Sequence, residues 1–472
     1  MDNFIQSKKK KIFCLKIPAK ATVYYTAVSA AAKAVGIITT PIFTRILSEA
    51  EYGKYSFYMS WLGLFTVISS SVIAPSVIYR GLEKFKEEKE EFLFSALRLG
   101  WLTTLVFSCF IFVFSKKFGL EKELAPIISM QLICDCVINL SQTIYRYNYN
   151  YKKLSAIYAF SVAATPIFSI FLIQKARLGY LGRVYALLGV SLIIAIPQLL
   201  KIIKASKKRR EKRLFLYLSR RALPLIPNSV SLALGAEFDK LMLTAVLGAA
   251  ALAKYSIAHT LGLGVGFAVS AVSSALYPWV IRKLSEKKEE LVRPIASSVL
   301  YALSGLGILI SVFTPELFAF LAPKDYGVAA IATLPLILST VPSFCSSFIT
   351  LGLIYEEKGG FTAVSAVIST LFGIFLNLIL IPRFQYFGAA SSLLFSSLTA
   401  MAINYFFLKK RTNTDILRFE SFLKAFAVTL VGISLSVIVK DFLALRILLL
   451  ILPISLWFYA FCDLEPLLRE RL

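Results

Sequence analysis

Long apolar stretches alternate with short polar segments along the chain, from about residue 21 to residue 462. Each stretch is about 20 residues long, which is the length that an α-helix needs to cross a hydrocarbon core of about 30 Å. The stretches are apolar throughout and do not alternate apolar with polar residues, which argues against a transmembrane β-barrel. The pattern therefore predicts an all-α polytopic membrane protein.

We expect about 14 transmembrane helices, seven in each half of the chain. The spans of the first half are expected near 21–44, 55–79, 93–114, 125–144, 154–173, 184–200 and 222–246. Those of the second half are expected near 255–280, 294–314, 327–352, 361–381, 389–408, 421–438 and 447–461. An even number of crossings places both termini on the same side of the membrane.

Composition and charge support this interpretation. The chain is 57% hydrophobic and 17% charged, with a mean hydropathy of +0.73, which leaves little length for an aqueous domain and rules out a soluble enzyme. The net charge of +25 is concentrated in the segments that are cytoplasmic if the N-terminus is cytoplasmic, as the positive-inside rule requires. The expected location is a plasma membrane, the inner membrane of a bacterium, with both termini in the cytoplasm. The expected partner of the basic surface is the lipid bilayer, and no nucleic-acid-binding motif accompanies the charge.

The sequence lacks the features of an ATP-driven or catalytic protein. It has no Gly-x-x-x-x-Gly-Lys-Ser/Thr segment, so the energy source must be an ion gradient, the membrane potential or the substrate gradient. The expected outer loops are too short for an extracytoplasmic catalytic site, so we expect no enzyme and no catalytic residues. The six cysteines form no Cys-x-x-Cys pair, and we expect no metal site and no cofactor apart from coupling to H⁺ or Na⁺.

The longest aqueous segment, residues 201–221, contains a run of basic residues at 207–210 and divides the chain. We interpret it as a cytoplasmic hinge. The predicted organisation is an N-terminal six-helix bundle (1–200), this hinge (201–221), a second six-helix bundle (222–418) and two additional transmembrane helices (419–472).

Two pairs of similar segments indicate that the bundles are a duplication. Residues 47–56 (LSEAEYGKYS) align with residues 247–256 (LGAAALAKYS) at an offset of 200. At an offset of 206, Arg177, Tyr180 and Gly182 align with Arg383, Tyr386 and Gly388. Both pairs fall at equivalent places in the two halves, which predicts a parallel repeat of six helices. The Lys-Tyr-Ser ending of the first pair is expected in short outer turns that anchor at the headgroup level.

Charged residues inside predicted spans are candidates for function because a charge at membrane depth is costly without a partner or a wet cavity. Lys33 in the first span and Lys240 in the seventh occupy equivalent helices and predict a cationic central cavity for an anion such as a lipid phosphate. The alternative is that Lys240 pairs with Glu237, three residues earlier.

Acidic residues in the spans suggest a second role. Asp135, Glu237 and Asp239 are candidates for holding a proton or Na⁺ and coupling transport to an ion gradient. The alternative for Asp135 is a hydrogen-bonded carboxyl that partners Lys33 or a neighbouring helix. His259, the single histidine, is interpreted as a polar cap near the outer face, with a proton relay as the alternative.

Gly262, Gly264 and Gly266 stand in a Leu-Gly-Leu-Gly-Val-Gly-Phe stretch that resembles a phosphate-binding glycine loop. No strand precedes the stretch and no acid follows at the expected distance, so we interpret these glycines as sites of close helix packing or a kink.

Residues 36–58, GIITTPIFTRILSEAEYGKYSFY, resemble the first helix and outer turn of the polysaccharide-export (O-antigen, Wzx-type) flippases of the MOP exporter superfamily, which is MATE-like in fold. A second helix ending in Pro-Ser-Val-Ile-Tyr-Arg at 75–80 and an Asp-Lys element at 239–240 extend the resemblance. Ala253 departs from the glycine that is usual in the family at the second outer turn.

The resemblance implies alternating access and the transfer of an undecaprenyl-pyrophosphate-linked oligosaccharide, such as an O-antigen repeat unit of lipopolysaccharide, to the outer leaflet. It also implies that cationic residues bind the pyrophosphate and sugar acids, and by position we expect Lys33, Arg80 and Lys240, supported by Arg45 and Arg98. A polysaccharide polymerase and a chain-length regulator are candidate partners.

Three alternatives stay open at this point. A cation-coupled multidrug exporter of the same superfamily would need an acidic, aromatic cavity, which two lysines at depth argue against. A lipid II flippase is a close variant of the implied function. A non-transporting scaffold for polysaccharide assembly would tolerate neutralisation of the cavity charges.

Overall fold

The computed structural model describes residues 34–114, 119–121, 123–206, 211–286, 288–356, 358–411 and 416–469. These ranges are helical and contain no β-strand, as the hydropathy pattern predicts. Nine helices within them are long and apolar enough to cross a membrane. The predicted all-α membrane fold is confirmed, while the count of 14 crossings stays a prediction.

The chain divides into two compact units. Of the described residues, unit 1 comprises those within 34–47 and 58–233, and unit 2 comprises those within 48–57 and 234–469. Two helices, α2 (Glu49–Ser70) and α9 (Ile226–Leu247), contribute residues to both units. The division therefore falls inside helices, and the described residues of the segment predicted as a hinge, 201–206 and 211–221, lie in unit 1.

Unit 1 contains a helix at Ala34–Ile46 and six further α-helices besides its part of α2 and α9. These are α3 (Pro75–Lys84), α4 (Lys89–Phe114), α5 (Leu124–Tyr147), α6 (Tyr151–Gln174), α7 (Tyr180–Ala205) and α8 (Lys212–Ala222). Short 3₁₀ turns lie at Ser71–Ile73, Lys86–Glu88 and Leu223–Leu225.

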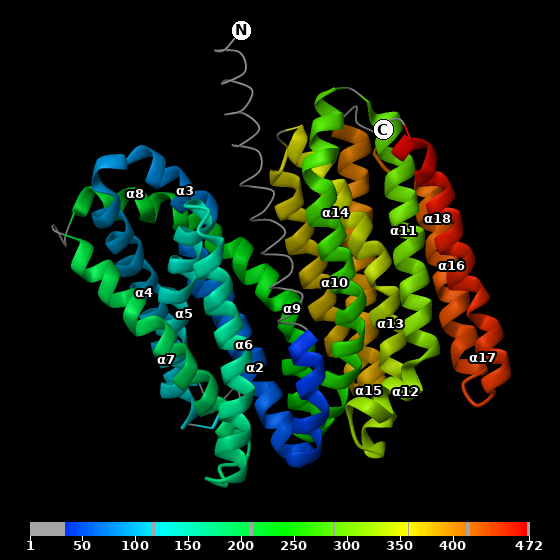
Figure 1. Cartoon of the computed structure of the whole chain (residues 1–472), viewed down its shortest axis with the longest axis horizontal. Coiled ribbons are helices and arrows are strands. Elements are labelled where there is room, and N and C mark those ends of the chain that lie inside the picture. The colour runs from blue at the N-terminus through cyan, green and yellow to red at the C-terminus, as the bar shows by residue number, and fades with distance from the viewer. Residues whose placement is uncertain are drawn as a thin grey trace. The chain divides into compact units, whose positions relative to one another are not determined.

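Packing in unit 1 follows from these sequences. The second predicted span is interrupted at Ala74, whose extended backbone (ψ 134°) is the conformation favoured before proline, so α3 begins anew at Pro75. Helices α5 and α7 pack together, as do α6 and α7 (Figure 1). Helix α8 is amphipathic: Leu214 and Leu218 are fully buried and α8 packs against α4, while Arg213 is exposed.

Unit 2 contains the remaining helices, and Figure 1 shows α10, α11, α14 and α16 running alongside one another. The elements are α10 (Ala249–Ser285), α11 (Glu289–Val312), α12 (Thr314–Leu321), η4 (Lys324–Ala332), α13 (Thr333–Leu338), α14 (Thr340–Tyr355), α15 (Gly360–Arg411), α16 (Phe419–Ile438), α17 (Leu443–Leu449) and α18 (Ile451–Arg469). Three of them, η4, α13 and α14, occupy the predicted span 327–352.

The C-terminal helices pack on α11 within unit 2. Helices α16 and α18 both contact α11, and a Cβ atom at Gly305 would approach the Trp457 ring to 2.7 Å. The Arg446 guanidinium binds both carboxylate oxygens of Glu316, 130 residues away in sequence. The segment predicted as two additional helices, 419–472, is thus joined to unit 2 by a tight helix contact and a buried arginine.

The backbone repeats at the offsets found in the sequence. Helix α2 begins at residue 49 and α10 at residue 249, which differ by 200. Gly179 (φ 54°, ψ −138°) and Gln385 (φ 50°, ψ −122°), which differ by 206, share a left-handed conformation. In each case a glycine three residues later, Gly182 or Gly388, lies too close to the preceding helix for a larger residue to fit easily. These features support the predicted duplication.

Two equivalent segments of the repeat contact each other within unit 2. A Cβ atom at Gly53 would lie only 1.8 Å from the Ala249 carbonyl oxygen, so α2 and α10 approach closely at their first turns. The carboxylate of Glu49 pairs with Lys254 at 3.1 Å. Glycine at residue 53 is required by this close approach.

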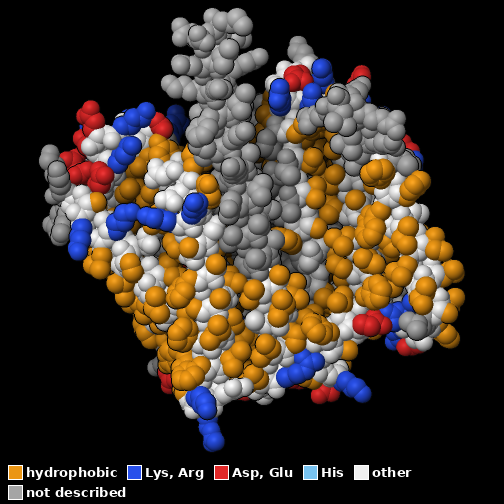
Figure 2. All heavy atoms as spheres, in the orientation of Figure 1, with side chains coloured by type: hydrophobic (Ala, Val, Ile, Leu, Met, Phe, Trp, Pro, Cys, Tyr) orange, Lys and Arg blue, Asp and Glu red, His pale blue; other side chains and the backbone are white. Residues whose placement is uncertain are grey.

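Surface chemistry matches a membrane environment. In Figure 2, hydrophobic side chains cover the middle of each unit, and Lys, Arg, Asp and Glu gather toward the ends of the helices. Many large apolar side chains in the described ranges are exposed, among them Val113, Ile167, Ile438 and Phe458. Such exposure is favourable in lipid, and the chain is a multi-pass membrane protein.

Candidate functional site

The charged residues of the seventh predicted span lie on α9 in unit 2. The ammonium of Lys240 lies 2.7 Å from a Glu237 carboxylate oxygen, and both side chains are largely buried. The spacing of three residues with the acid nearer the N-terminus suits this pair. The structure thus shows the contact that was one of two alternatives for Lys240, and its ammonium also donates to the Ala236 carbonyl at 3.3 Å.

Asp239 turns away from that pair into the interior of unit 2. Its side chain is 1% exposed, and one carboxylate oxygen accepts a 2.7 Å hydrogen bond from the Tyr255 hydroxyl on α10. Tyr255 is fully buried, so its expected role as a headgroup anchor is wrong. The reason is that α10 already begins at residue 249, which places Tyr255 in a packed second turn that faces α9.

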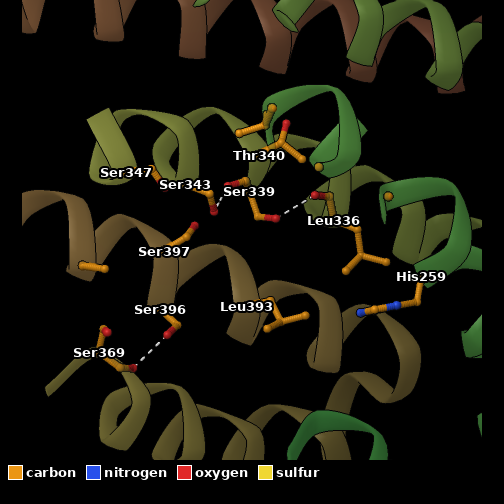
Figure 3. A pocket seen from close by; sticks show the side chains of 14 residues that line it. His259, Leu336, Ser339, Thr340, Ser343, Ser347, Ser369, Leu393, Ser396 and Ser397 are labelled. Atoms are coloured by element: carbon orange, nitrogen blue, oxygen red, sulfur yellow. Dashed lines mark hydrogen bonds between the residues drawn. The ribbon is translucent and has the colours of Figure 1, made fainter. Parts of the chain in front are cut away.

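A hollow of about 330 Å³ lies inside unit 2, and hydroxyl groups line much of it (Figure 3). This volume is at the lower end of ordinary ligand pockets. The hydroxyl-bearing residues come from the segment around α13 and α14 and from α15, and they are Ser339, Thr340, Ser343, Ser347, Ser369, Ser396 and Ser397. His259 of α10 also lines the hollow, and no Asp, Glu, Lys or Arg does.

Most of these hydroxyls donate to backbone carbonyls. Ser343 donates to the Ser339 carbonyl at 2.7 Å, and Ser396 donates to the Ser369 carbonyl at 2.8 Å (Figure 3). A serine oxygen that has donated its hydrogen keeps lone pairs that can accept a hydrogen bond. The hollow therefore offers uncharged acceptors to a ligand that is rich in donors, such as a sugar.

His259 connects the hollow to the buried acid. Its ring lies 6.0 Å from the Tyr255 ring, centroid to centroid, and Tyr255 in turn binds Asp239. Asp239 is thus separated from the hollow by two aromatic side chains on α10. The sequence placed His259 near the outer face, and the structure adds that it borders this hollow.

The glycine stretch of α10 forms part of the wall. A Cβ atom at Gly262 would lie 2.8 Å from the Leu336 side chain, whereas a Cβ atom at Gly266 would meet nothing within 4 Å. The interpretation of close helix packing is confirmed for Gly262. Gly266 instead lines the hollow and leaves it open.

In unit 1, Asp135 lies near the middle of α5 within a polar cluster. One of its carboxylate oxygens accepts from the Gln131 amide at 2.9 Å and the other from the Thr66 hydroxyl at 3.3 Å. The same amide nitrogen donates to the Ser191 hydroxyl at 2.8 Å. The cluster joins α2, α5 and α7, and in the described ranges no cationic side chain pairs with Asp135.

The expected cationic residues of unit 1 that the structure describes have different surroundings. Arg45 is exposed and donates to the Pro41 carbonyl at 2.9 Å at the end of its helix. Arg80 is exposed on α3, and Arg98 of α4 lies over the Phe215 ring of α8 at 5.4 Å. Lys33 lies outside the described residues.

Arg98 also borders a second hollow, of about 660 Å³, which is largely apolar. Its walls include Trp101, Leu105 and Phe112 of α4 and Ile133 of α5. Such a surface fits a lipid chain better than a sugar. Among the described residues no three His, Cys, Asp or Glu side chains gather as metal ligands in either unit.

Sequence reasoning missed the serine-lined hollow. One signal was present: Ser339, Ser343 and Ser347 recur every four residues, which puts them on one helix face. The contribution of α15 could not be found in this way, since Ser396 and Ser397 reach the hollow only through tertiary packing.

Fold and site together define the class of protein: a multi-pass helical membrane protein with internal polar sites set in apolar helices. The sequence model of the family described as polysaccharide biosynthesis protein matches residues 19–284. Because the match covers more than half of the chain, the protein belongs to this family. The relationship predicted from residues 36–58 is thereby confirmed. A search of curated protein sequences finds no significant match.

Solved structures share the fold at low sequence identity. A lipid II flippase, MurJ, in an inward closed conformation matches with a TM-score of 0.76 and 15% identity over 94% of this chain and 100% of that one. An inward-facing multidrug resistance MATE transporter of the MOP superfamily matches at 0.62 and 12% identity, over 83% and 94%. A MOP superfamily transporter from Pyrococcus furiosus matches at 0.53 and 13%, over 84% and 96%. These matches confirm the MATE-like fold.

Proposed function

We propose that the protein is a flippase that moves an undecaprenyl-pyrophosphate-linked oligosaccharide from the cytoplasmic to the outer leaflet by alternating access. The observation that carries this proposal is the hollow of unit 2, where seven hydroxyl-bearing residues line a space that no charged side chain lines. Membership in a polysaccharide biosynthesis family supports a glycan as the ligand. The protein acts in this proposal as a transporter and not as an enzyme.

The hollow suits the sugar part of such a substrate. Moving a saccharide through hydrocarbon exposes its hydroxyls to an environment without hydrogen-bond partners, at a cost of several kcal/mol per unsatisfied group. Acceptors such as the Ser343 and Ser397 oxygens replace water as hydrogen-bond partners of the sugar. Because no charged side chain lines the hollow, the sugar is not held so tightly that its release is slow. Specificity among sugars then depends on the shape of the hollow.

The pyrophosphate needs positive charge. The residues that we propose for it are Lys33, Arg80, Lys240, Arg45 and Arg98. The positive charge of Lys240 is partly neutralised by Glu237, whose carboxylate lies 2.7 Å from its ammonium. Arg98 is placed at the edge of the apolar hollow of α4, where a charged headgroup and a lipid chain can be held together.

The remaining features follow from the same proposal. The protein works in a bacterial inner membrane with both termini in the cytoplasm, and residues 201–221 act as a hinge between the predicted bundles 1–200 and 222–418. A polysaccharide polymerase and a chain-length regulator use the product, and H⁺ or Na⁺ drives transport.

The test is a proteoliposome assay in which a fluorescent undecaprenyl-pyrophosphate oligosaccharide is scored for leaflet by a membrane-impermeant quencher. The most specific variant is Gly266→Leu. A Cβ atom at residue 266 has no protein atom within 4 Å, so the leucine side chain can extend into the hollow that this residue lines. Gly189→Leu on α7 is the matched control: a helical glycine with equally open surroundings that lines neither hollow.

We expect the parent protein and Gly189→Leu to accelerate flipping and Gly266→Leu to lose at least about nine-tenths of the rate. Equal rates for both variants would show that the hollow does not bind the substrate. A second arm with lipid II tests the variant function that the fold of MurJ suggests. A third arm with a cationic dye under a Na⁺ or pH gradient tests a multidrug exporter, for which the MATE fold is the supporting observation.

A further inference from the structure

We infer that the apolar hollow of about 660 Å³ on α4 is a binding site for an anionic phospholipid of the membrane, with the lipid phosphate at Arg98 and an acyl chain in the hollow. The site lies in unit 1 and is separate from the serine-lined hollow of unit 2. The inference rests on the proposed function in one respect only: a phospholipid bound at Arg98 competes with the transported pyrophosphate for that side chain.

The first argument is the shape of the hollow. Its walls are formed by α4, with Ser129 and Ile133 of α5 and Phe215 of α8. The contributing residues of α4 lie on one helix face, and they are Arg98, Trp101, Leu102, Leu105, Ser108 and Phe112. Leu105 and Phe112 are 61% and 55% exposed, so the hollow is open at the surface of the unit. It is therefore a groove along α4 that a lipid chain can enter from the side.

The second argument is the length of this groove. From Arg98 to Phe112 the helix rises by about 21 Å. One leaflet, measured from its headgroups to the middle of the bilayer, is about 20–22 Å thick, which is half of the whole bilayer. The groove therefore matches a phospholipid with its headgroup at Arg98 and the end of its acyl chain at Phe112. An undecaprenyl chain is much longer than one leaflet and fits the groove less well.

The third argument is the charge at one end of the groove. The Arg98 guanidinium lies 5.4 Å from the centre of the Phe215 ring, where α4 contacts α8. Lys212 is exposed and stands three residues before Phe215, on the same side of α8, so it adds positive charge at this end. No Asp or Glu among the described residues lines the groove. Arginine binds phosphate oxygens through charge-assisted hydrogen bonds, and an acyl chain below that phosphate then extends along α4.

The position of α8 indicates the depth of this end in the membrane. Helix α8 lies at one end of unit 1 (Figure 1) and within the segment that is predicted to be cytoplasmic. It buries Leu214 and packs against α4, while Arg220 and Arg221 are exposed. A basic amphipathic helix of this kind lies in the membrane interface and attracts the anionic lipids of the cytoplasmic leaflet. Arg98, which contacts α8, is therefore at the level of the lipid phosphates.

The experiment measures quenching of tryptophan fluorescence in the purified full-length protein in detergent, as phosphatidylglycerol with brominated acyl chains is added. Bromine quenches the tryptophans that it contacts, and Trp101 lines the groove. The signal of Trp101→Phe is subtracted, because the chain has three other tryptophans. Brominated phosphatidylcholine with the same acyl chains tests the headgroup. Unbrominated phosphatidylglycerol and undecaprenyl phosphate are added as competitors to test the chain.

Two variants and one control locate the site. Arg98→Gln removes the charge at the end of the groove, and Ser129→Leu fills part of the groove itself. Arg220→Gln is the matched control, since it removes an exposed arginine of α8 that does not line the groove. Each variant is compared only after its thermal unfolding has been shown to match that of the parent.

We expect saturable quenching of Trp101, with half-saturation at about tenfold less phosphatidylglycerol than phosphatidylcholine, because a hydrogen bond between charged groups contributes that much. Arg98→Gln should remove this preference, and Arg220→Gln should keep it. Ser129→Leu should weaken quenching by both lipids. Unbrominated phosphatidylglycerol should restore the fluorescence at a lower concentration than undecaprenyl phosphate.

Other outcomes would overturn the inference. Equal half-saturation for the two phospholipids, unchanged in Arg98→Gln, would show that the groove holds only the lipids that surround any membrane protein. Stronger competition by undecaprenyl phosphate would assign the groove to the transported lipid. Neither outcome bears on flipping, and a protein that binds phosphatidylglycerol at Arg98 but flips no glycolipid would refute the proposed function alone.

Discussion

The two units hold carboxyl groups in different ways. In unit 1, Asp135 is met only by the neutral dipoles of an amide and a hydroxyl in the described ranges. In unit 2, Glu237 pairs with Lys240 and the half-exposed Glu316 pairs with Arg446, whereas the buried Asp239 accepts from the Tyr255 hydroxyl. An ion pair fixes both of its side chains in one arrangement, whereas a carboxyl held by neutral donors has no counter-charge. The two units therefore differ in their ion pairs, while each also holds one aspartate by neutral hydrogen-bond donors.

The largest effect is expected at the buried arginine of unit 2. Arg446 is 7% exposed and donates to Glu316 and to the Val312 carbonyl. Glu316→Gln leaves a buried cation without a counter-charge and should lower stability by about 3 kcal/mol. Arg446→Leu leaves only a half-exposed acid and should be milder. Thermal unfolding measures the loss of stability in each variant. Equal losses in the two variants would show that the unpaired arginine is no more costly than the unpaired acid.

The next effect concerns the acid of unit 2 that resembles Asp135 most. Tyr255→Phe removes the phenol that donates to the buried carboxylate of Asp239, which should lower stability by about 2 kcal/mol. Thr66→Val, which removes the weaker 3.3 Å donor of Asp135, should change stability by less than half as much. If Thr66→Val is the more damaging variant in a melting experiment, the two acids are held alike and the comparison fails.

A smaller effect should separate the two halves of the repeat. Gln385 has φ 50° and ψ −122°, a conformation that glycine adopts easily and other residues do not. Gln385→Gly should therefore stabilise the protein by about 1 kcal/mol, and Gly179→Gln should destabilise it. The measurement is the change in Tm of each single variant. Loss of stability in Gln385→Gly would mean that the glutamine side chain matters more than its backbone strain.

The smallest effect is a pH dependence outside the membrane-spanning segments. The guanidinium of Arg446 lowers the pKa of Glu316 below its usual value near 4.5. A carboxyl whose pKa is lower in the folded state stabilises it above the unfolded pKa, and this contribution disappears as the pH falls through the folded pKa. The parent should therefore lose more stability than Glu316→Gln between about pH 5 and pH 3. Parallel melting curves of the two proteins over this range would contradict the assignment.

Much of the fold could be predicted because a membrane restricts the choices. An apolar run of about 20 residues has no stable alternative to a helix in lipid, so every predicted span in the described ranges falls on helical backbone. Breaks inside the runs were harder to locate. The interruption at Gln385 has no glycine or proline signal at that residue, and the one at Ala74 is marked only by the proline that follows.

Contacts of the site could be predicted from the sequence where both partners lie close together on one helix. The contact of Glu237 with Lys240 follows from a spacing of three residues on one helix. The contact of Arg446 with Glu316 could not be predicted, since 130 residues separate them and no pattern in either segment indicates the other. The hydrogen bond of Gln131 to Ser191 was also hidden, because 60 residues separate them.

Gly179 and Gln385 also record how the chain arose. If one ancestral bundle was copied, both descendants inherited the same backbone turn, yet only one keeps the residue that forms it most easily. What was passed on is therefore the path of the chain, and the side chain was free to drift once packing on both sides fixed that path. Relatives of this protein can be compared by their backbone torsion angles where their amino-acid sequences no longer agree. Duplicated helix bundles should be sought by the same comparison of torsion angles.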